Sequence, residues 1–204
     1  GRAASEAELD DVLAHMNAER QKYVVPVAPH SQPPALASWL ERRGFARGYA
    51  WMKFCRPCDG ALRVASDLEI RVIGSDLAVE YGRVVTQGYG LPPEIAPWVG
   101  QLAGRPNWVC VMAFADATPV AAGAVYVNGE YAWLGFGATL PSHRRRGAQN
   151  ALLARRLSEG AARGARMAVT ETGERLPEKP SASYQNILRA GFEEMYLRQN
   201  YMSS

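Results

Sequence analysis

Three consecutive arginines and a glycine, placed where a helix is expected to begin, form the most informative segment of the sequence. They are Arg144, Arg145, Arg146 and Gly147. A helix N-terminus leaves about four backbone N–H groups without partners and carries about half a positive charge. Glycine lets a ligand approach this backbone closely, and arginine adds bidentate donors that match phosphate oxygens. The segment therefore predicts a pyrophosphate-binding turn, and the alternative is an exposed basic loop before an ordinary helix.

The cysteines are a second group that could do chemistry. Cys55 and Cys58 have the spacing of half a zinc site or of a redox pair, but no second pair follows them. The histidines, His15, His30 and His143, are scattered. We therefore expect two incidental thiols and no metal. A sparse and odd number of cysteines also argues against a secreted disulfide framework and favours a reducing cytoplasm.

The composition places this chemistry in a globular chain. Of the 204 residues, 48% are apolar and 21% are charged, which allows a buried core. The longest apolar runs, 108–115 and 120–127, have the length of strands, so we expect no membrane span. The chain starts at Gly1 without an initiator Met or an apolar signal core. We expect a cytoplasmic protein, and whether the native chain extends further at this end stays open.

The charge balance restricts the class of partner. A formal net charge of +3 excludes a chain that is basic throughout, so any electropositive site is local. Nucleic-acid binding would require the arginines of the C-terminal half to share one face. Arg155 and Arg156 point about 100° apart on an expected helix. We therefore expect no nucleic-acid partner.

The elements that must position the arginine segment follow from periodicity and turn signals, which predict an α/β body from Leu68 onward. Asn128-Gly129 is a strong signal for a two-residue hairpin between two strands. The helix after the arginines has an expected apolar stripe of Ala151, Leu152, Leu153, Leu157 and Ala161. The predicted strands are 68–73, 107–115, 119–127, 131–139, 166–170 and 192–201, and the predicted helices are 77–86, 94–102, 146–163 and 181–190.

The first sixty residues repeat the element order of the C-terminal end. A helix from Ser5 to Arg20, a strand over 23–27, a helix over 34–43 and a strand over 48–55 are predicted in succession. Gly44-Phe45 with Tyr49 matches the spacing of Gly191-Phe192 with Tyr196. We interpret this order as half of a duplicated unit, followed by a linker rich in turn residues.

The segment from Arg144 to Gln149 resembles the acyl-CoA pyrophosphate loop of the GCN5-related N-acetyltransferases (GNATs), with the pattern Gln/Arg-x-x-Gly-x-Gly/Ala. Gln149 departs from that pattern at its last position. The approach through Thr139-Leu140-Pro141 and the Gly191-Phe192 pair after the last helix also resemble the family. The resemblance covers residues 68–201 in the expected element order.

This resemblance implies a fold and a domain organisation. We expect a GNAT-like mixed, mostly antiparallel central sheet that is flanked by helices and preceded by a partial GNAT-like βα unit. Residues 1–58 would be a degenerate half-repeat without a CoA site, 59–67 a linker and 68–204 a complete acetyltransferase domain.

The resemblance also implies an activity, the direct transfer of an acetyl group from acetyl-CoA to an amine of a small molecule or peptide. Acetyl-CoA would be the co-substrate, with no metal. The developing oxyanion needs donors, which backbone N–H groups of the fourth strand supply if its neighbour splays away. The expected cofactor-binding residues are Ala138, Thr139, Leu140, Arg144, Arg145, Arg146, Gly147, Ala148 and Gln149.

The catalytic residues of the family include a tyrosine four residues before the glycine of the Gly-Phe pair, and that position holds Ile187 in this sequence. Tyr184 lies one helical turn away and is the candidate acid. Glu171, at the end of the fifth strand, is the candidate base. Each has a structural alternative, namely a packed aromatic for Tyr184 and a solvated carboxylate for Glu171.

The alternative function is a CoA-binding sensor without turnover. In either case we expect no membrane partner, and a monomer or a homodimer. No pattern in the sequence identifies the acceptor.

Overall fold

The computed structural model describes residues 3–18, 22–60, 62, 64–178 and 181–203. Helix α1 is present where it was expected, although its expected end at Arg20 lies outside the described residues. The α-helices are α1 (Glu6–Ala18), α2 (Leu36–Arg42), α3 (Ala78–Tyr89), α4 (Ala96–Gly100), α5 (Ala148–Ala162) and α6 (Ala182–Arg189). The strands are β1 (Val24–Val27), β2 (Ala46–Pro57), β3 (Glu69–Ile73), β4 (Trp108–Ala115), β5 (Thr118–Asn128), β6 (Tyr131–Thr139), β7 (Met167–Gly173) and β8 (Glu193–Met202).

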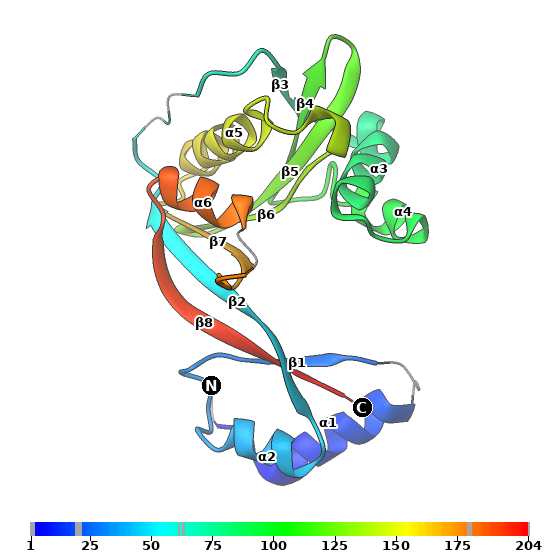
Figure 1. Ribbon diagram of the computed structural model, residues 1–204, viewed down its shortest axis with the longest axis vertical. Coiled ribbons are helices and arrows are strands. Elements are labelled where there is room, and N and C mark those ends of the chain that lie inside the picture. Colours follow the sequence, from blue (N-terminus) through cyan, green and yellow to red (C-terminus); the bar gives the residue numbers. More distant parts are fainter. Residues whose placement is uncertain (1–2, 19–21, 61, 63, 179–180, 204) are drawn as a thin grey trace. The chain divides into compact units, whose positions relative to one another are not determined.

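The strands form one sheet of eight in the order β1-β8-β2-β7-β6-β5-β4-β3 (Figure 1). The pairs β3/β4, β4/β5, β5/β6 and β1/β8 are antiparallel, and β6/β7 is parallel. The fold is therefore the mixed, mostly antiparallel sheet flanked by helices that the sequence predicted. The predicted hairpin between β5 and β6 is present, but its two turn residues are Gly129 and Glu130, because Asn128 still pairs with Tyr131.

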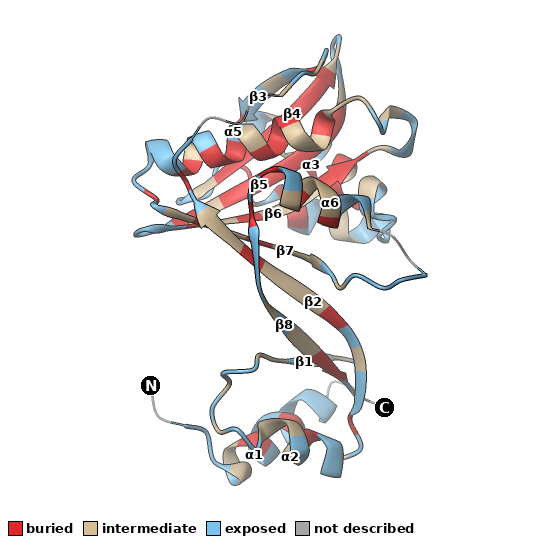
Figure 2. Cartoon of the chain, turned by 60° about the vertical axis from the view of Figure 1, so that its left-hand side comes forward, coloured by how far each residue is buried: buried red, intermediate tan, exposed pale blue. Residues whose placement is uncertain are grey.

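The larger of two compact units comprises residues 54–171 and 182–193. In this unit α3 and α4 cover one face of the strands β4 to β6, and α5 covers the other (Figure 1). Nearly all of β4 and β5 is buried (Figure 2), which explains their uninterrupted apolar runs. The core under α3 contains Tyr81, Val84, Val85, Val99, Cys110, Met112 and Phe114.

The predicted apolar stripe of α5 is correct except at its end. Ala151, Leu152, Leu153 and Leu157 are buried, whereas Ala161 is exposed. Gly160 is buried in its place, because the helix lies so close to β6 there that a Cβ on Gly160 would be 2.9 Å from the Cβ of Ala132. The predicted helix over 94–102 is shorter than expected, because a 3₁₀ turn over Pro93–Ile95 precedes α4.

The smaller unit comprises residues 1–53, 172–181 and 194–204. Helix α1 starts with a capping box, in which the Glu8 carboxylate accepts from the Ser5 N–H at 2.8 Å and the Ser5 hydroxyl accepts from the Glu8 N–H at 3.2 Å. Arg43 pairs with Asp10 and with Glu6. The core of this unit consists of Leu9, Leu13, Leu40, Phe45 and Tyr201.

No helix in the described part of the chain combines the length and the apolar character needed to cross a bilayer.

Helices α3 and α4 approach each other at two glycines. A Cβ on Gly82 would lie 2.1 Å from the Ala96 carbonyl oxygen, and a Cβ on Gly100 would lie 2.5 Å from the Ala78 carbonyl oxygen. Both obstacles are backbone atoms, so relief requires one helix to move. These glycines therefore set the distance between α3 and α4.

We expect Gly82→Ala to lower the free energy of unfolding by about 2 kcal/mol or more, because overpacking costs about 1–3 kcal/mol. The sign is informative, since alanine in a helix interior otherwise stabilises by up to about 1 kcal/mol. Urea unfolding measures the change. Gly173→Ala is the control, because nothing lies within 4 Å of its Cβ position. A stabilised Gly82→Ala protein would contradict this account of the helix contact.

Candidate functional site

The parallel strands β6 and β7 separate halfway along their length. Their register runs from Tyr131↔Met167 to Leu134↔Thr170. Strand β6 continues to Thr139 and β7 continues to Gly173, but no pairing between them follows within the described residues. The Thr170 hydroxyl closes the paired part by donating to the Leu134 carbonyl at 2.8 Å. One edge of β6 beyond Leu134 is thus without a partner strand, which is the splay that the sequence analysis required.

A bulge interrupts β6 directly after this point. Phe136 has a φ of 55°, and the register of β5 against β6 shifts between Ala122 and Ala124. A positive φ in a residue with a bulky side chain stores strain, about 1–3 kcal/mol, and such strain concentrates at functional sites. Gly135 and Gly137 flank Phe136. The backbone of β6 therefore changes direction at the point where β6 and β7 separate.

The bulge and the pairing with β5 decide which N–H groups of β6 face the open edge. The Leu140 N–H donates to the Val120 carbonyl on β5 at 2.9 Å, so it is already engaged. Because successive N–H groups of a strand alternate between its two edges, the N–H of Thr139 and that of Gly137 face away from β5. Of the expected donors Ala138, Thr139 and Leu140, Thr139 thus has the N–H on the open edge.

Eight residues separate β6 from α5, which starts at Ala148, two residues later than expected. Its N-cap is Gly147, which has a φ of 77° and a ψ of −1°. No side chain caps this end within the described residues, and the first N–H to bond back is that of Ala151, which donates to the Gly147 carbonyl at 3.0 Å. The N–H groups of Ala148, Gln149 and Asn150 therefore form the uncapped, positive end of the helix dipole.

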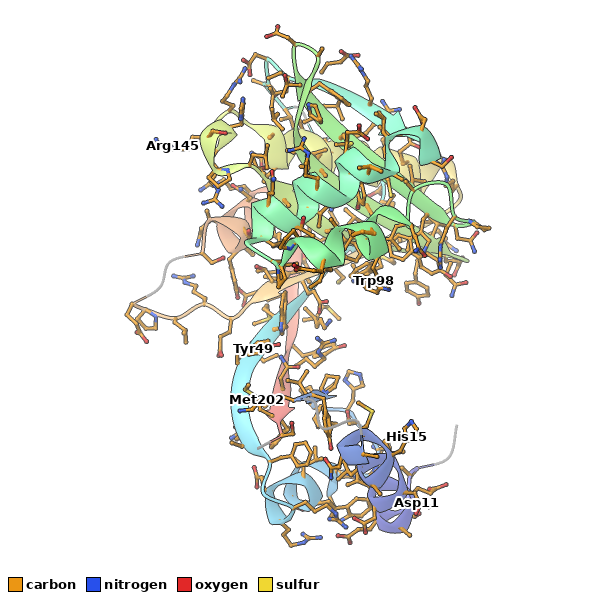
Figure 3. All side chains as sticks on the ribbon, turned by 90° about the vertical axis from the view of Figure 1, so that its right-hand side faces the viewer. Asp11, His15, Tyr49, Trp98, Arg145 and Met202 are labelled. Carbon is orange, nitrogen blue, oxygen red and sulfur yellow. The ribbon has the colours of Figure 1, made fainter. Side chains whose placement is uncertain are left out.

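The three arginines before α5 differ in their surroundings. Arg146 pairs with Asp67, and the Arg146 guanidinium lowers the pKa of that carboxyl. Arg144 is exposed and donates to the Gly88 carbonyl at 3.4 Å. Arg145 is exposed, has a φ of 65°, and extends away from the loop (Figure 3). Neither Arg144 nor Arg145 forms an ion pair with a described residue, so these two supply the uncompensated charge.

Gln149, the departure from the family pattern, lies between the loop and β6. Its side-chain N–H donates to the Thr139 hydroxyl at 2.7 Å, and its side-chain oxygen lies 3.0 Å from where a Cβ on Gly137 would be. The longer side chain therefore joins the start of α5 to the end of β6. The structure brings Thr139 and residues 144–149 together at one end of this strand and helix.

Glu171 is the first residue of β7 beyond its last pair with β6, and it is partly exposed. Its backbone therefore lies where the two strands part, and its role as the base stays a prediction. Tyr184, in contrast, is only 3% exposed, and its ring meets that of Phe54 edge-on with centroids 5.0 Å apart. Ile187, one turn further along α6, is also buried.

Sequence reasoning missed two features of this site. The bulge had a signal, because glycines within a strand pattern indicate a bulge, and Gly135 and Gly137 are two residues apart. The sequence signal for Arg156 is weaker. It lies four residues after the buried Leu152 on α5 and is only 4% exposed, whereas the neighbouring Arg155 is on the surface and pairs with Glu159. Arg156 therefore does not contribute to a basic surface for nucleic acid.

The described residues contain no group of three or more His, Cys, Asp or Glu side chains that could hold a metal ion. Neither Cys55 nor Cys58 forms a disulfide with a described residue, and burial raises the pKa of the Cys58 thiol.

Comparison with known proteins gives structural matches alone. No protein-family model and no curated protein matches the chain. A GCN5-related N-acetyltransferase from Kribbella flavida matches with a TM-score of 0.71 at 18% identity, covering 100% of this chain and 78% of that one. A GCN5-related N-acetyltransferase from Sphaerobacter thermophilus matches with a TM-score of 0.71 at 15% identity, covering 97% of this chain and 65% of that one.

A tandem GNAT protein from the clavulanic acid biosynthesis pathway also matches, with a TM-score of 0.65 at 17% identity, covering 96% of this chain and 69% of that one. At these sequence identities the matches show the fold alone. The chain has the fold of the GCN5-related N-acetyltransferases.

Proposed function

We propose that this protein is an acyltransferase that moves the acetyl group of acetyl-CoA directly to an amine of a small molecule or peptide. The observation that carries the proposal is the juxtaposition of two features. The unpaired edge of β6 ends at Thr139, and the uncapped N-terminus of α5 begins at Gly147 beside two exposed arginines that form no ion pair with a described residue. An acyl-CoA requires both an anion site for its pyrophosphate and a strand edge for its amide-containing arm.

The residues of the loop fit a pyrophosphate. The N–H groups of Ala148 and Gln149 supply donors, and Arg144 and Arg145 supply charge. Arg146 is already paired with Asp67, so its part in the proposal is to hold the loop rather than the phosphate. The N–H of Thr139, whose hydroxyl accepts from Gln149 of the same loop, supplies a further donor on the open edge of β6.

Each step of the transfer has a candidate group in the chain. Acetyl-CoA supplies an acyl group on a thiolate that leaves readily. Glu171 accepts a proton from the amine, whose nitrogen then forms the C–N bond as the C–S bond breaks. The N–H groups of Gly137 and Thr139 donate to the thioester oxygen as negative charge develops on it. Tyr184 donates a proton to the departing sulfur.

The proposal extends to the N-terminal segment, with residues 1–58 as a degenerate half-repeat that lacks a CoA site, 59–67 as a linker and 68–204 as the transferase domain. Two observations support it. The order helix, strand, helix, strand occurs in α1-β1-α2-β2 and again in α5-β7-α6-β8. The strand order β1-β8-β2-β7 shows the same correspondence. Exchanging β1 with β7 and β2 with β8 gives β7-β2-β8-β1, which is the original order read from the other end.

A CoA-binding sensor is the second candidate function, and α6 is the observation that favours it. Ile187 occupies the position where the resemblance requires tyrosine. The nearest tyrosine, Tyr184, packs its ring against Phe54 and is almost entirely buried. A site that binds acyl-CoA without a proton donor for the sulfur would transfer the acyl group more slowly.

We expect the double variant Arg144→Glu/Arg145→Glu to weaken acetyl-CoA binding about tenfold or more, because it replaces two cations beside the phosphate site with anions. Isothermal titration calorimetry at two salt concentrations measures this, and added salt should narrow the difference. Arg105→Glu, an exposed arginine on another loop of the same unit, is the control. Equal affinities for wild type and double variant would place the phosphate elsewhere.

Gly147 is unsuitable for this test, because a Cβ there would lie 2.7 Å from the Ala65 carbonyl oxygen.

We expect Glu171→Gln to lower kcat about 100-fold and to leave the dissociation constant of acetyl-CoA within threefold, because a general base contributes about 10²–10⁴ to the rate. The assay follows thiol release from acetyl-CoA with the best amine of an acceptor panel. Glu130→Gln, at the β5/β6 hairpin, is the matched control. Retention of wild-type kcat by Glu171→Gln would remove Glu171 as the base.

For Tyr184→Phe we expect kcat to fall about tenfold with unchanged acetyl-CoA affinity, since the phenylalanine ring keeps the packing against Phe54 and loses only the hydroxyl. The loss is smaller than for the base, because a thiol with a pKa of about 8.5 is a fair leaving group. A fall of less than fivefold would exclude Tyr184 as the acid. Tight acetyl-CoA binding by the wild type without turnover of any amine would favour the sensor.

A further inference from the structure

Arg156 of α5 is a buried cation without an ion pair among the described residues. It is 4% exposed. Its Nε–H donates to the Leu152 carbonyl at 3.1 Å, and its Nη1 donates to the Gly135 carbonyl at 3.0 Å. Burial of a charge is costly unless the charge is paired, and two backbone carbonyls compensate only part of the cost. Because burying the Arg156 charge costs free energy, we look for a function of this side chain other than packing.

The sheet is shaped to receive this guanidinium. A Cβ on Gly123 of β5 would lie 2.9 Å from the Nε of Arg156, and a Cβ on Gly137 of β6 would lie 3.3 Å from its Nη2. Any larger residue at Gly123 would displace the guanidinium or the strand. The two glycines lie beside the register shift of β5 against β6, so the guanidinium of Arg156 packs against this irregularity.

The hydrogen bond to Gly135 acts on the peptide group directly before Phe136. With a φ of 55°, Phe136 is in a conformation that its side chain disfavours, so its neighbours must impose it. Arg156 holds the carbonyl on one side of this residue. The peptide on the other side contains the N–H of Gly137, which faces the open edge of β6.

The groups that interact electrostatically with Arg156 carry no charge near neutral pH. They are Tyr81 and Tyr89 of α3, and Tyr81 is in turn coupled to Cys110 of β4. Burial raises the pKa of Tyr81 well above 10, and desolvation of its hydroxyl raises the pKa of Tyr89, although half of that residue is exposed. Burial raises the pKa of Cys110 to about 11. Burial lowers the pKa of Arg156 to about 10, so Arg156 stays cationic up to about pH 9.

We propose that Arg156 is a positioning residue for the acyl transfer, which holds the bulge Gly135–Phe136–Gly137 in place and puts a fixed positive charge behind the N–H groups that bind the thioester oxygen. The proposal rests on the proposed function. Negative charge develops on that oxygen only during the reaction, so the effect of Arg156 belongs to kcat and not to the binding of acetyl-CoA.

Two substitutions separate the charge from the packing. Arg156→Met removes the charge and the hydrogen bonds and keeps an unbranched chain. Arg156→Lys keeps a charge that titrates, because burial lowers the pKa of a lysine ammonium into the accessible range. Arg155→Met, on the adjacent exposed arginine, is the matched control. We would measure kcat from pH 6 to 9, the acetyl-CoA dissociation constant, and near-UV circular dichroism as a check of the fold.

For Arg156→Met we expect kcat to fall about 30-fold or more at every pH, with acetyl-CoA affinity within threefold of wild type. For Arg156→Lys we expect the ratio of its kcat to that of wild type to be highest at pH 6. This ratio should fall as the pH rises, because the lysine loses its proton and the arginine does not. Arg155→Met should follow wild type throughout.

Two results would overturn the proposal, namely a kcat for Arg156→Met within threefold of wild type, or an Arg156→Lys ratio that is independent of pH. If Arg156→Met does not fold, the pH dependence of Arg156→Lys decides alone. A wild-type protein that binds no acetyl-CoA would contradict the proposed function. Wild-type turnover with unaffected Arg156 variants would contradict only the role of Arg156.

Discussion

The separation of β6 from β7 after Leu134 and Thr170 is the constraint on which the site depends. The two strands share four residue pairs, about 13 Å of parallel sheet, whereas the crossover helix α5 has 15 residues and is about 22 Å long. The helix is therefore longer than the pairing beneath it. Its N-terminus lies at the carboxyl end of β6, where α/β sheets characteristically leave a crevice for ligands.

A strand without a partner on one edge needs another means of keeping its shape, and α5 provides it. Gln149 and Arg156 are seven residues apart, so they lie on the same face of the helix. Gln149 donates to the Thr139 hydroxyl at the end of β6, and Arg156 donates to the Gly135 carbonyl before the bulge. The apolar residues between them, Leu152 and Leu153, fill the core. These two polar contacts thus fix β6 at Gly135 and at Thr139, the part of the strand that contains the N–H groups of Gly137 and Thr139.

The sequence predicted the fold well because its local signals agree with the global arrangement. The hairpin that follows Asn128 sets the register of β5 and β6, and the apolar runs of β4 and β5 are long because both faces are buried. The loop from Arg144 to Gln149 could be located from residue types alone. Arg156 could not, because the helical period places it next to the buried stripe without saying that two distant glycines, Gly123 and Gly137, make room for a charge.

The chain segment before β3 shows why glycine by itself is weak evidence for a phosphate loop. A Cβ on Gly147 would lie 2.7 Å from the Ala65 carbonyl oxygen, the Ser66 hydroxyl donates to the Arg146 carbonyl at 3.2 Å, and Asp67 pairs with Arg146. Packing against residues 65–67 and a φ of 77° would demand glycine at position 147 even if no ligand ever approached. The ion pair with Asp67 also compensates the charge of Arg146. The packing does not explain why Arg144 and Arg145 are exposed beside an uncapped helix and form no ion pair with a described residue, and these two features, rather than Gly147, support the proposed anion site.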